Sequence, residues 1–166
     1  MKLYHGSTMI VRKPSVKRGR VTTDFGQGFY LTTSLEQAQR WALLKQRREN
    51  SKRAMVSVFD FDETMLTDIS YSVLQYDGPT EDWLNFVVKN RKGENTHSYD
   101  YVMGPVANDQ LYATISLYEK GTLTAEAAIV QLKTHVLFDQ LSCHTDKAVR
   151  NLRYIESIQV LKTNTL

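Results

Sequence analysis

Residues 24–33 read Asp-Phe-Gly-Gln-Gly-Phe-Tyr-Leu-Thr-Thr, and this stretch decides how the first third of the chain is expected to fold. Gly26 and Gly28 bracket a tight entry into a short strand, which we expect over residues 29–32. Tyr30 is the aromatic side chain that this strand directs outward. The stretch therefore predicts a turn followed at once by a strand that presents one tyrosine.

An amphipathic helix is predicted directly after this strand, over residues 35–49. Ser34 is a good N-cap, and Gln37 three residues later completes a capping-box pattern. A stripe of side chains at helical spacing forms the apolar face: Leu35, Ala38, Trp41, Ala42 and the stem of Lys45.

A second short apolar strand lies upstream, where residues 3–7 read Leu-Tyr-His-Gly-Ser. His5 precedes Tyr30 by 25 residues. A histidine on one strand and a tyrosine on the next are side chains that a pocket for a flat, charged ring needs. Taken singly, His5 also fits a hydrogen-bonded histidine at a strand end, and Tyr30 and Trp41 also fit aromatic residues of the core.

The rest of the chain alternates between strand and helix patterns. The expected strands cover residues 2–5, 53–61, 99–103, 136–144 and 154–162. Three more helices are expected, over residues 80–91, 109–119 and 125–135, and the first of these begins at Pro79 or Thr80. A short helical turn is expected after Thr145. This order predicts a mixed α/β or α+β arrangement, and the 166 residues fit one domain.

Composition favours a soluble cytoplasmic protein. The chain is 42% hydrophobic and 23% charged, which is enough to bury a core. The N-terminus lacks the apolar core of a signal peptide, and no apolar run approaches the roughly 20 residues of a membrane span. The single cysteine, Cys143, excludes an internal disulfide.

Basic residues are unevenly distributed, although the net charge is only +3. They gather in the loop over residues 8–23 and at the end of the first helix: Arg12, Lys13, Lys17, Arg18 and Arg20, then Lys45, Arg47, Arg48, Lys52 and Arg53. Such runs are most often solvated faces. The functional alternative is attraction of a pyrophosphate, a nucleic acid or an acidic protein surface.

Several familiar sites are absent from the sequence. It contains neither a GxGxxG fingerprint nor a GxxxxGK[ST] loop. The histidines show no metal-ligand spacing with cysteine or acidic residues, and the acidic run over residues 60–63 is more typical of a solvated turn. Cys143 and His144 are neighbours that point to opposite faces of a strand, so they make a poor catalytic couple. We therefore expect no metal.

Three motifs carry a resemblance to a known family. They are residues 3–7 (LYHGS), residues 24–33 (DFGQGFYLTT) and residues 139–145 (DQLSCHT). Together they resemble a bacterial family of ADP-ribosyltransferase-like proteins (DUF3990-type), in the branch of diphtheria toxin and the poly-ADP-ribose polymerases. The resemblance covers most of the chain. It implies an α+β fold of the ADP-ribosyltransferase type, with two small, roughly perpendicular β-sheets forming an NAD cleft and helices packed outside.

The resemblance also implies roles for residues around that cleft, with NAD as substrate. His5 would bond the hydroxyl of the nicotinamide-side ribose, and the backbone of Gly6 would hold the carboxamide. Tyr30 would stack on one side of the nicotinamide ring, and Trp41, 11 residues later, would close the other side. The remaining expected cofactor contacts are Ser7, Phe29 and, for the pyrophosphate, the basic loop with Arg12, Lys13 and Arg20.

The third motif departs from the family pattern. The implied third catalytic residue, beside His5 and Tyr30, is Gln140, at a position where the transferases carry glutamate. A glutamine keeps a hydrogen bond to the ribose 2′-hydroxyl, but it has no negative charge and cannot act as a general base. Asp139 is the neighbouring carboxylate, and we expect it on the opposite face of the strand.

The resemblance implies an NAD-dependent mono-ADP-ribosyltransferase that modifies a macromolecule, either protein or nucleic acid. Similar small bacterial proteins are often toxins of toxin–antitoxin pairs, so an antitoxin partner is also expected. Two alternatives stay open. One is a module of the same fold that binds NAD or ADP-ribose and has lost transfer, and the other is an RNA-directed relative similar to a tRNA 2′-phosphotransferase.

Overall fold

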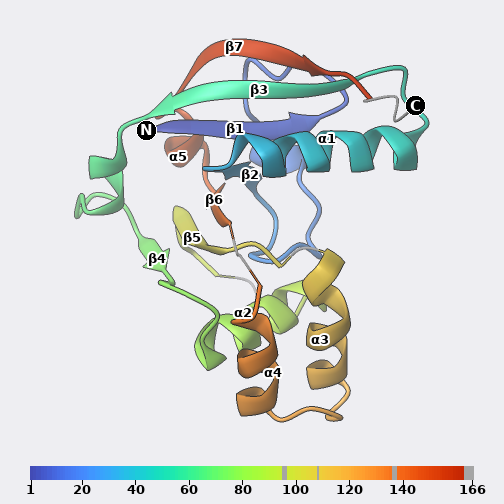
Figure 1. Cartoon of the computed structure of the whole chain (residues 1–166). Helices are drawn as coiled ribbons and strands as arrows, with labels where there is room; N and C mark the ends of the chain where they lie inside the picture. The colour runs from blue at the N-terminus through green and yellow to red at the C-terminus, as the bar shows by residue number, and fades with distance from the viewer. Residues whose placement is uncertain (95–96, 108, 136–137, 163–166) are drawn as a thin grey trace.

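A computed structural model describes residues 1–94, 97–107, 109–135 and 138–162 (Figure 1). The strands are β1 (Lys2–Ser7), β2 (Phe29–Thr32), β3 (Ala54–Phe61), β4 (Val73–Gln75), β5 (Tyr101–Pro105), β6 (Asp139–Cys143) and β7 (Leu152–Val160). The α-helices are α1 (Leu35–Glu49), α2 (Glu81–Arg91), α3 (Asp109–Glu119), α4 (Ala125–Leu132) and α5 (Asp146–Val149). Two short 3-10 helices are η1 (Val16–Arg18) and η2 (Glu63–Leu66).

The seven strands form a single sheet in the order β4-β5-β6-β2-β1-β3-β7. The architecture is α+β, as the sequence predicts, but the expected pair of separate sheets is wrong for the strands described. The reason lies at the middle of the sheet, where β1 and β2 pair in register only at Tyr4 and Thr32. One short pairing thus joins two halves, β4-β5-β6-β2 and β1-β3-β7.

Helix α1 covers one face of the β1-β3-β7 half (Figure 1). The Ser34 side chain accepts a hydrogen bond from the Gln37 amide, so the predicted N-cap is confirmed. Ala38 and Ala42 are fully buried against this face. Gly6 permits the close approach, because a Cβ atom there would lie 2.1 Å from the Ala38 carbonyl oxygen. The helix bounds match the sequence expectation of residues 35–49.

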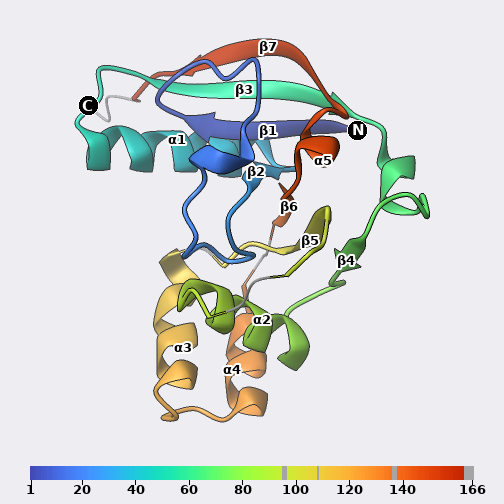
Figure 2. The same cartoon turned by 180° about the vertical axis from the view of Figure 1, so that it is seen from behind.

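The opposite face of the sheet carries an aromatic and aliphatic core to which both halves contribute, and the loop after β1 lies against it (Figure 2). The core contains Leu3, Phe29, Phe59 and Leu141, among others, and Val11 and Val16 of the loop pack against it. The Val11 amide donates to the Ser57 hydroxyl on β3, at 2.9 Å. The predicted long surface loop is therefore attached to the sheet through both apolar and polar contacts.

Helices α2, α3 and α4 gather at the other end of the molecule, beyond β5 and away from β7 (Figures 1 and 2). They enclose a second core around the fully buried Trp83, whose indole nitrogen donates to the Pro105 carbonyl at 3.1 Å. Phe25, from the stretch that precedes β2, belongs to this core. That stretch therefore connects the two halves of the molecule.

Most predicted elements occur, with shifted boundaries. α3 has the predicted bounds, α4 ends at Leu132 rather than at residue 135, and β5 covers residues 101–105 rather than 99–103. β7 begins two residues earlier than predicted. The strand expected over residues 136–144 is β6 over residues 139–143; residues 136–137 lie outside the described part.

None of the helices in the described part of the chain is both long and apolar enough to span a lipid bilayer.

Candidate functional site

His5 lies where the sheet divides between β1 and β2. Beyond the pairing of Tyr4 with Thr32, a side chain also connects the two strands: His5 Nδ1 lies 2.7 Å from the Tyr30 carbonyl oxygen. The imidazole stacks on Phe29 with ring centroids 4.2 Å apart and planes 25° apart. The histidine therefore spans the point at which the two halves of the sheet separate.

The protonation state of His5 follows from this environment. Burial lowers the pKa of His5 to about 4, against the opposing effect of the hydrogen bond to Tyr30, and the charge of Lys45 lowers it further. The ring is therefore neutral at pH 7. Because a carbonyl oxygen can only accept, Nδ1 carries the hydrogen and Nε2 keeps a free lone pair. Such a nitrogen can accept a hydrogen bond from a hydroxyl group.

The hydroxyl of Tyr30 is held within the stretch that precedes its own strand. It donates to the Gly26 carbonyl at 2.6 Å and accepts from the Phe25 amide at 2.9 Å. The Thr23 hydroxyl, also at 2.9 Å, donates to the same oxygen. Burial raises the pKa of Tyr30 well above its usual value, so the phenol remains protonated. The sequence did not predict this role of the hydroxyl group.

Gly6 and Trp41 lie next to one another on the α1 side of the sheet. The Trp41 Cβ atom is 3.0 Å from the position that a Gly6 Cβ would take. Tyr4 of β1 packs on the α1 side, and it pairs with Thr32 of β2. Because side chains alternate along a strand, Thr32 and Tyr30 lie on the same face of β2. Trp41 and Tyr30 thus lie on the same side of the divided sheet, on α1 and β2 respectively. Trp41 is partly buried.

Gln140 occupies a buried position on β6 and is 2% exposed. Its Nε2 donates to Asp24 Oδ2 at 2.9 Å and lies 3.4 Å from the Pro105 carbonyl. Because a carboxylate accepts only, the amide nitrogen faces Asp24 and the amide oxygen faces elsewhere. Asp139 is exposed on the other face, as the strand alternation predicts. In this structure Gln140 therefore holds Asp24 in place.

Asp24 is the centre of a buried polar network that the sequence did not reveal. Arg91 of α2 donates through Nε to Asp24 Oδ1 at 2.8 Å, and its Nη2 lies 2.7 Å from the same oxygen. The Ala107 amide donates to Asp24 Oδ2 at 3.1 Å. A carboxylate that is only 9% exposed needs such partners. The signal available in the sequence was an acidic residue opening an otherwise apolar and glycine-rich stretch.

Two further histidines fix the same stretch. His97 Nε2 lies 2.7 Å from the Phe25 carbonyl, and His144 Nδ1 lies 2.7 Å from the Gln27 carbonyl. The two imidazoles meet edge to face at 4.5 Å between centroids. Burial lowers the pKa of His144 to about 4, so this ring is neutral and its Nε2 accepts from Ser142. Residues 24–28 are therefore positioned by side chains from β2, α2 and β6 and from the segment before β5.

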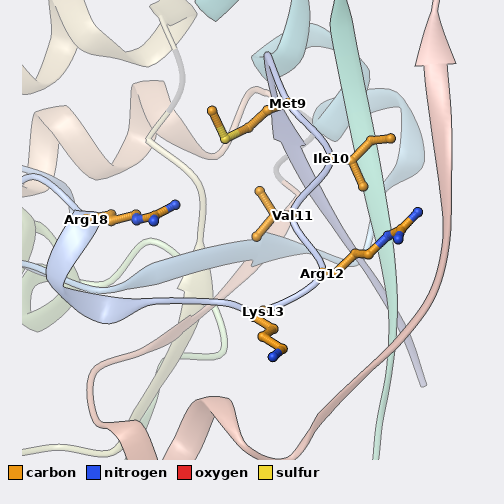
Figure 3. A pocket seen from close by; sticks show the side chains of 6 residues that line it. All are labelled: Met9, Ile10, Val11, Arg12, Lys13 and Arg18. Atoms are coloured by element: carbon orange, nitrogen blue, oxygen red, sulfur yellow. The ribbon is translucent and has the colours of Figure 1, made fainter.

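The other predicted contacts lie on the His5 face or in the loop. Ser7 is buried on β1, and Arg12 stacks over Tyr154 at 5.7 Å. Arg20 is exposed. A cavity of about 510 Å³ opens in the loop (Figure 3), lined by Met9, Ile10, Val11, Arg12, Lys13 and Arg18. The side chains of His5 and Phe29 thus lie on one side of the divided sheet, whereas Gly6, Tyr30 and Trp41 lie on the α1 side.

Other reactive groups are occupied or buried. Burial raises the pKa of the Cys143 thiol, so it stays protonated. Asp62 caps η2 through the Thr64 amide, and Asp60 pairs with Arg153 at 2.9 Å. Within the residues that the structure describes, no group of three or more His, Cys, Asp and Glu side chains is arranged to hold a metal ion.

The sequence matches the model of one protein family over most of its length. A family model described as "Protein of unknown function (DUF3990)" matches residues 1–154, so the chain belongs to the DUF3990 family. A search of curated proteins finds no match.

Proposed function

We propose that the protein is an NAD-dependent mono-ADP-ribosyltransferase that acts on a macromolecule. The observation that carries the proposal is the position of His5 at the division of the sheet, bonded to the Tyr30 carbonyl and keeping Nε2 free. A neutral imidazole fixed in this way is suited to accept from a ribose hydroxyl. Its tautomer and orientation are set before any ligand arrives, which lowers the entropic cost of binding.

The nicotinamide would lie on the α1 side of the divided sheet, between Tyr30 of β2 and Trp41 of α1. The missing Cβ of Gly6 does not provide this space, because the α1 backbone fills it, so Gly6 would contribute only its main chain. Base stacking on one aromatic ring contributes about 1–3 kcal/mol in nucleic-acid sites, so two rings provide substantial affinity for a planar ring without a charged contact. The Tyr30 hydroxyl is already occupied by residues 23–26, so this ring contributes its face rather than its oxygen.

The reaction would proceed mainly through positioning. The C1′–N bond between ribose and nicotinamide breaks with its electron pair leaving on nicotinamide. A lone pair of the acceptor then forms the new bond to C1′, and any proton on the acceptor atom passes to water. Gln140 would offer its amide oxygen to the ribose 2′-hydroxyl, because its nitrogen is directed at Asp24. No general base is provided at this position, so the acceptor must itself be nucleophilic.

The direct test is incubation of the purified protein and a cell extract with NAD labelled in the adenylate part. We expect label in macromolecular material or in free ADP-ribose, and we expect Tyr30→Ala and His5→Ala to prevent it. The two variants must be compared at temperatures where circular dichroism shows them folded. Normal turnover by either folded variant would remove this site from the reaction.

The biological role that we propose is that of a toxin with a neutralising antitoxin. Expression in a bacterial host should then arrest growth, and Tyr30→Ala should relieve the arrest at equal protein level. Arrest that persists in this variant would separate toxicity from NAD chemistry.

A second candidate is a module that binds NAD or ADP-ribose without transfer. The observation that favours it is the commitment of Gln140 to Asp24, which leaves no carboxylate free at the third position. Saturable binding of NAD by calorimetry, together with no release of nicotinamide over hours, would select this module over the enzyme.

A further inference from the structure

The charges of this protein are divided along the chain. Residues 1–53 contain 12 of the 21 lysines and arginines but only three of the 18 aspartates and glutamates. The rest of the chain is therefore acidic, and the modest net charge of +3 conceals a strongly basic part. Such asymmetry is a physical indication of a polyanionic partner.

Most basic side chains of this part are exposed, although Arg12 also stacks over Tyr154. Ten of them, in the loop after β1 and around the end of α1, are exposed. They are Arg12, Lys13, Lys17, Arg18, Arg20, Lys45, Arg47, Arg48, Lys52 and Arg53. In the described part of the chain, Arg40 is the lysine or arginine of residues 12–53 that forms an ion pair, with Glu36. The ten residues named above therefore have no carboxylate partner there.

The two basic segments meet at the same end of the sheet. The Thr8 hydroxyl, at the start of the loop, donates to the Glu49 carboxylate at the end of α1, at 2.9 Å. Lys45 is close enough to His5 to lower the pKa of that histidine. The basic side chains therefore continue from the loop, on one face of the sheet, around to the end of α1, on the other face, with Lys45 nearest to His5.

The loop cavity is lined by both apolar and basic side chains. Arg12, Lys13 and Arg18 contribute to its lining, and no acidic side chain does (Figure 3). At about 510 Å³ it is large enough for a phosphate with an attached sugar. Guanidinium groups match phosphate oxygens with paired hydrogen bonds, and lysine supplies a point charge.

We propose that the surface formed by these ten residues binds the phosphodiester backbone of a nucleic acid, which is the acceptor of the reaction proposed above. The role of the nucleic acid as acceptor rests on the proposed function. The binding itself does not, because it can be measured without NAD. A nucleic acid fits better than a lipid surface, because the apolar face of α1 is buried against the sheet and offers no anchor for acyl chains. Ring nitrogens and phosphate oxygens are also nucleophilic acceptors that need no base at Gln140.

The test uses the full chain, a fluorescein-labelled 20-nucleotide single-stranded RNA and DNA of the same sequence, with fluorescence anisotropy between 50 and 200 mM salt. The helix-end variant is Arg47→Gln/Arg48→Gln/Lys52→Gln. Its control is Lys120→Gln/Lys133→Gln/Arg150→Gln, which removes the same charge from exposed positions elsewhere. Anionic vesicles and an acidic protein serve as competitors.

We expect salt-dependent binding of the wild type. The slope of log K against log salt should be smaller by about two in the helix-end variant, since each lost contact to a single strand removes about 0.7. Affinity at 100 mM salt should fall at least about tenfold, while the control variant stays within about twofold. Equal affinity for RNA and DNA would mean that the surface recognises only the phosphodiester backbone. Binding of RNA but not DNA would mean that it also recognises the 2′-hydroxyl.

Three results would overturn the inference: no binding at 50 mM salt, an equal loss in the control variant, or complete displacement by vesicles or by the acidic protein. NAD binding is measured separately by calorimetry. If the wild type binds RNA but not NAD, the proposed function is wrong and the nucleic-acid surface is supported. If it binds NAD but not RNA, the nucleic-acid surface alone is wrong.

Discussion

The Gln140 amide nitrogen donates to Asp24 Oδ2 at 2.9 Å, across 116 residues of sequence. Asp24 is also bonded by Arg91 and by the Ala107 amide, so the network links β6, α2 and the stretch that precedes β2. This pairing gives a physical reason for glutamine at the third catalytic position. A glutamate there would place a second carboxylate against a buried one.

Gln140→Glu should therefore destabilise the protein rather than raise its activity. We expect a loss of about 3 kcal/mol in the free energy of unfolding at pH 8, because two buried carboxylates share a single arginine. The loss should shrink as the pH falls, since one carboxyl takes up a proton. Urea unfolding at pH 8 and pH 5 measures both effects. Gln140→Met, which lacks the charge, is the control; a Gln140→Glu variant as stable as wild type at pH 8 would refute the network.

Tyr30 should show two separable contributions, one from its ring and one from its hydroxyl. Tyr30→Phe removes the oxygen that accepts from Phe25 and Thr23, so it should cost about 1–3 kcal/mol of stability. The ring remains, so the folded variant should bind NAD as wild type does. Tyr30→Ala should lose both stability and NAD binding. Calorimetric titration below the unfolding temperature of each variant tests this, and equal NAD affinity of Tyr30→Ala and Tyr30→Phe would contradict it.

The local elements around the candidate site could be predicted because their signals are local. Ser34 and Gln37 determine where α1 begins, and the pattern of residues 35–49 determines its buried face. Thr124 and Thr145 cap α4 and α5 in the same way, each by accepting a hydrogen bond from an amide three residues later. Each of these rests on side chains within four residues of one another.

The partners of those elements could not be predicted, because they depend on tertiary contacts. Arg91 lies 67 residues from Asp24, and His144 lies 117 residues from Gln27. The union of two half-sheets into one depends on a single pairing of Tyr4 with Thr32. Sequence patterns show which residues are buried, but they do not show which buried polar groups meet.

Gly6→Ala should destabilise the fold through the contact between β1 and α1. The new Cβ would lie 2.1 Å from the Ala38 oxygen and 2.9 Å from the Ala42 nitrogen, both backbone atoms, so α1 would have to move. We expect a loss of about 3 kcal/mol, at the upper end of overpacking effects. Gly78→Ala is the matched control, because no atom lies within 4 Å of its added Cβ. Thermal unfolding of the two variants should differ clearly; equal melting temperatures would mean that α1 does not pack as described.

The stability of the protein should fall as the pH drops from about 6.5 towards 4. The pKa of His5 is about 4 in the folded state and near 6.5 in the unfolded chain, so only the unfolded state takes up the proton in this range. The stabilisation is thus fully present above pH 6.5 and is lost on acidification. His5→Asn keeps an amide donor for the Tyr30 carbonyl but cannot titrate, so its unfolding free energy should vary less between pH 7 and pH 4.5. His135→Asn, at an exposed position, is the control for the replacement of a histidine by asparagine. Equal pH dependence in wild type and His5→Asn, measured by urea unfolding, would show that His5 is not held neutral between the two halves of the sheet.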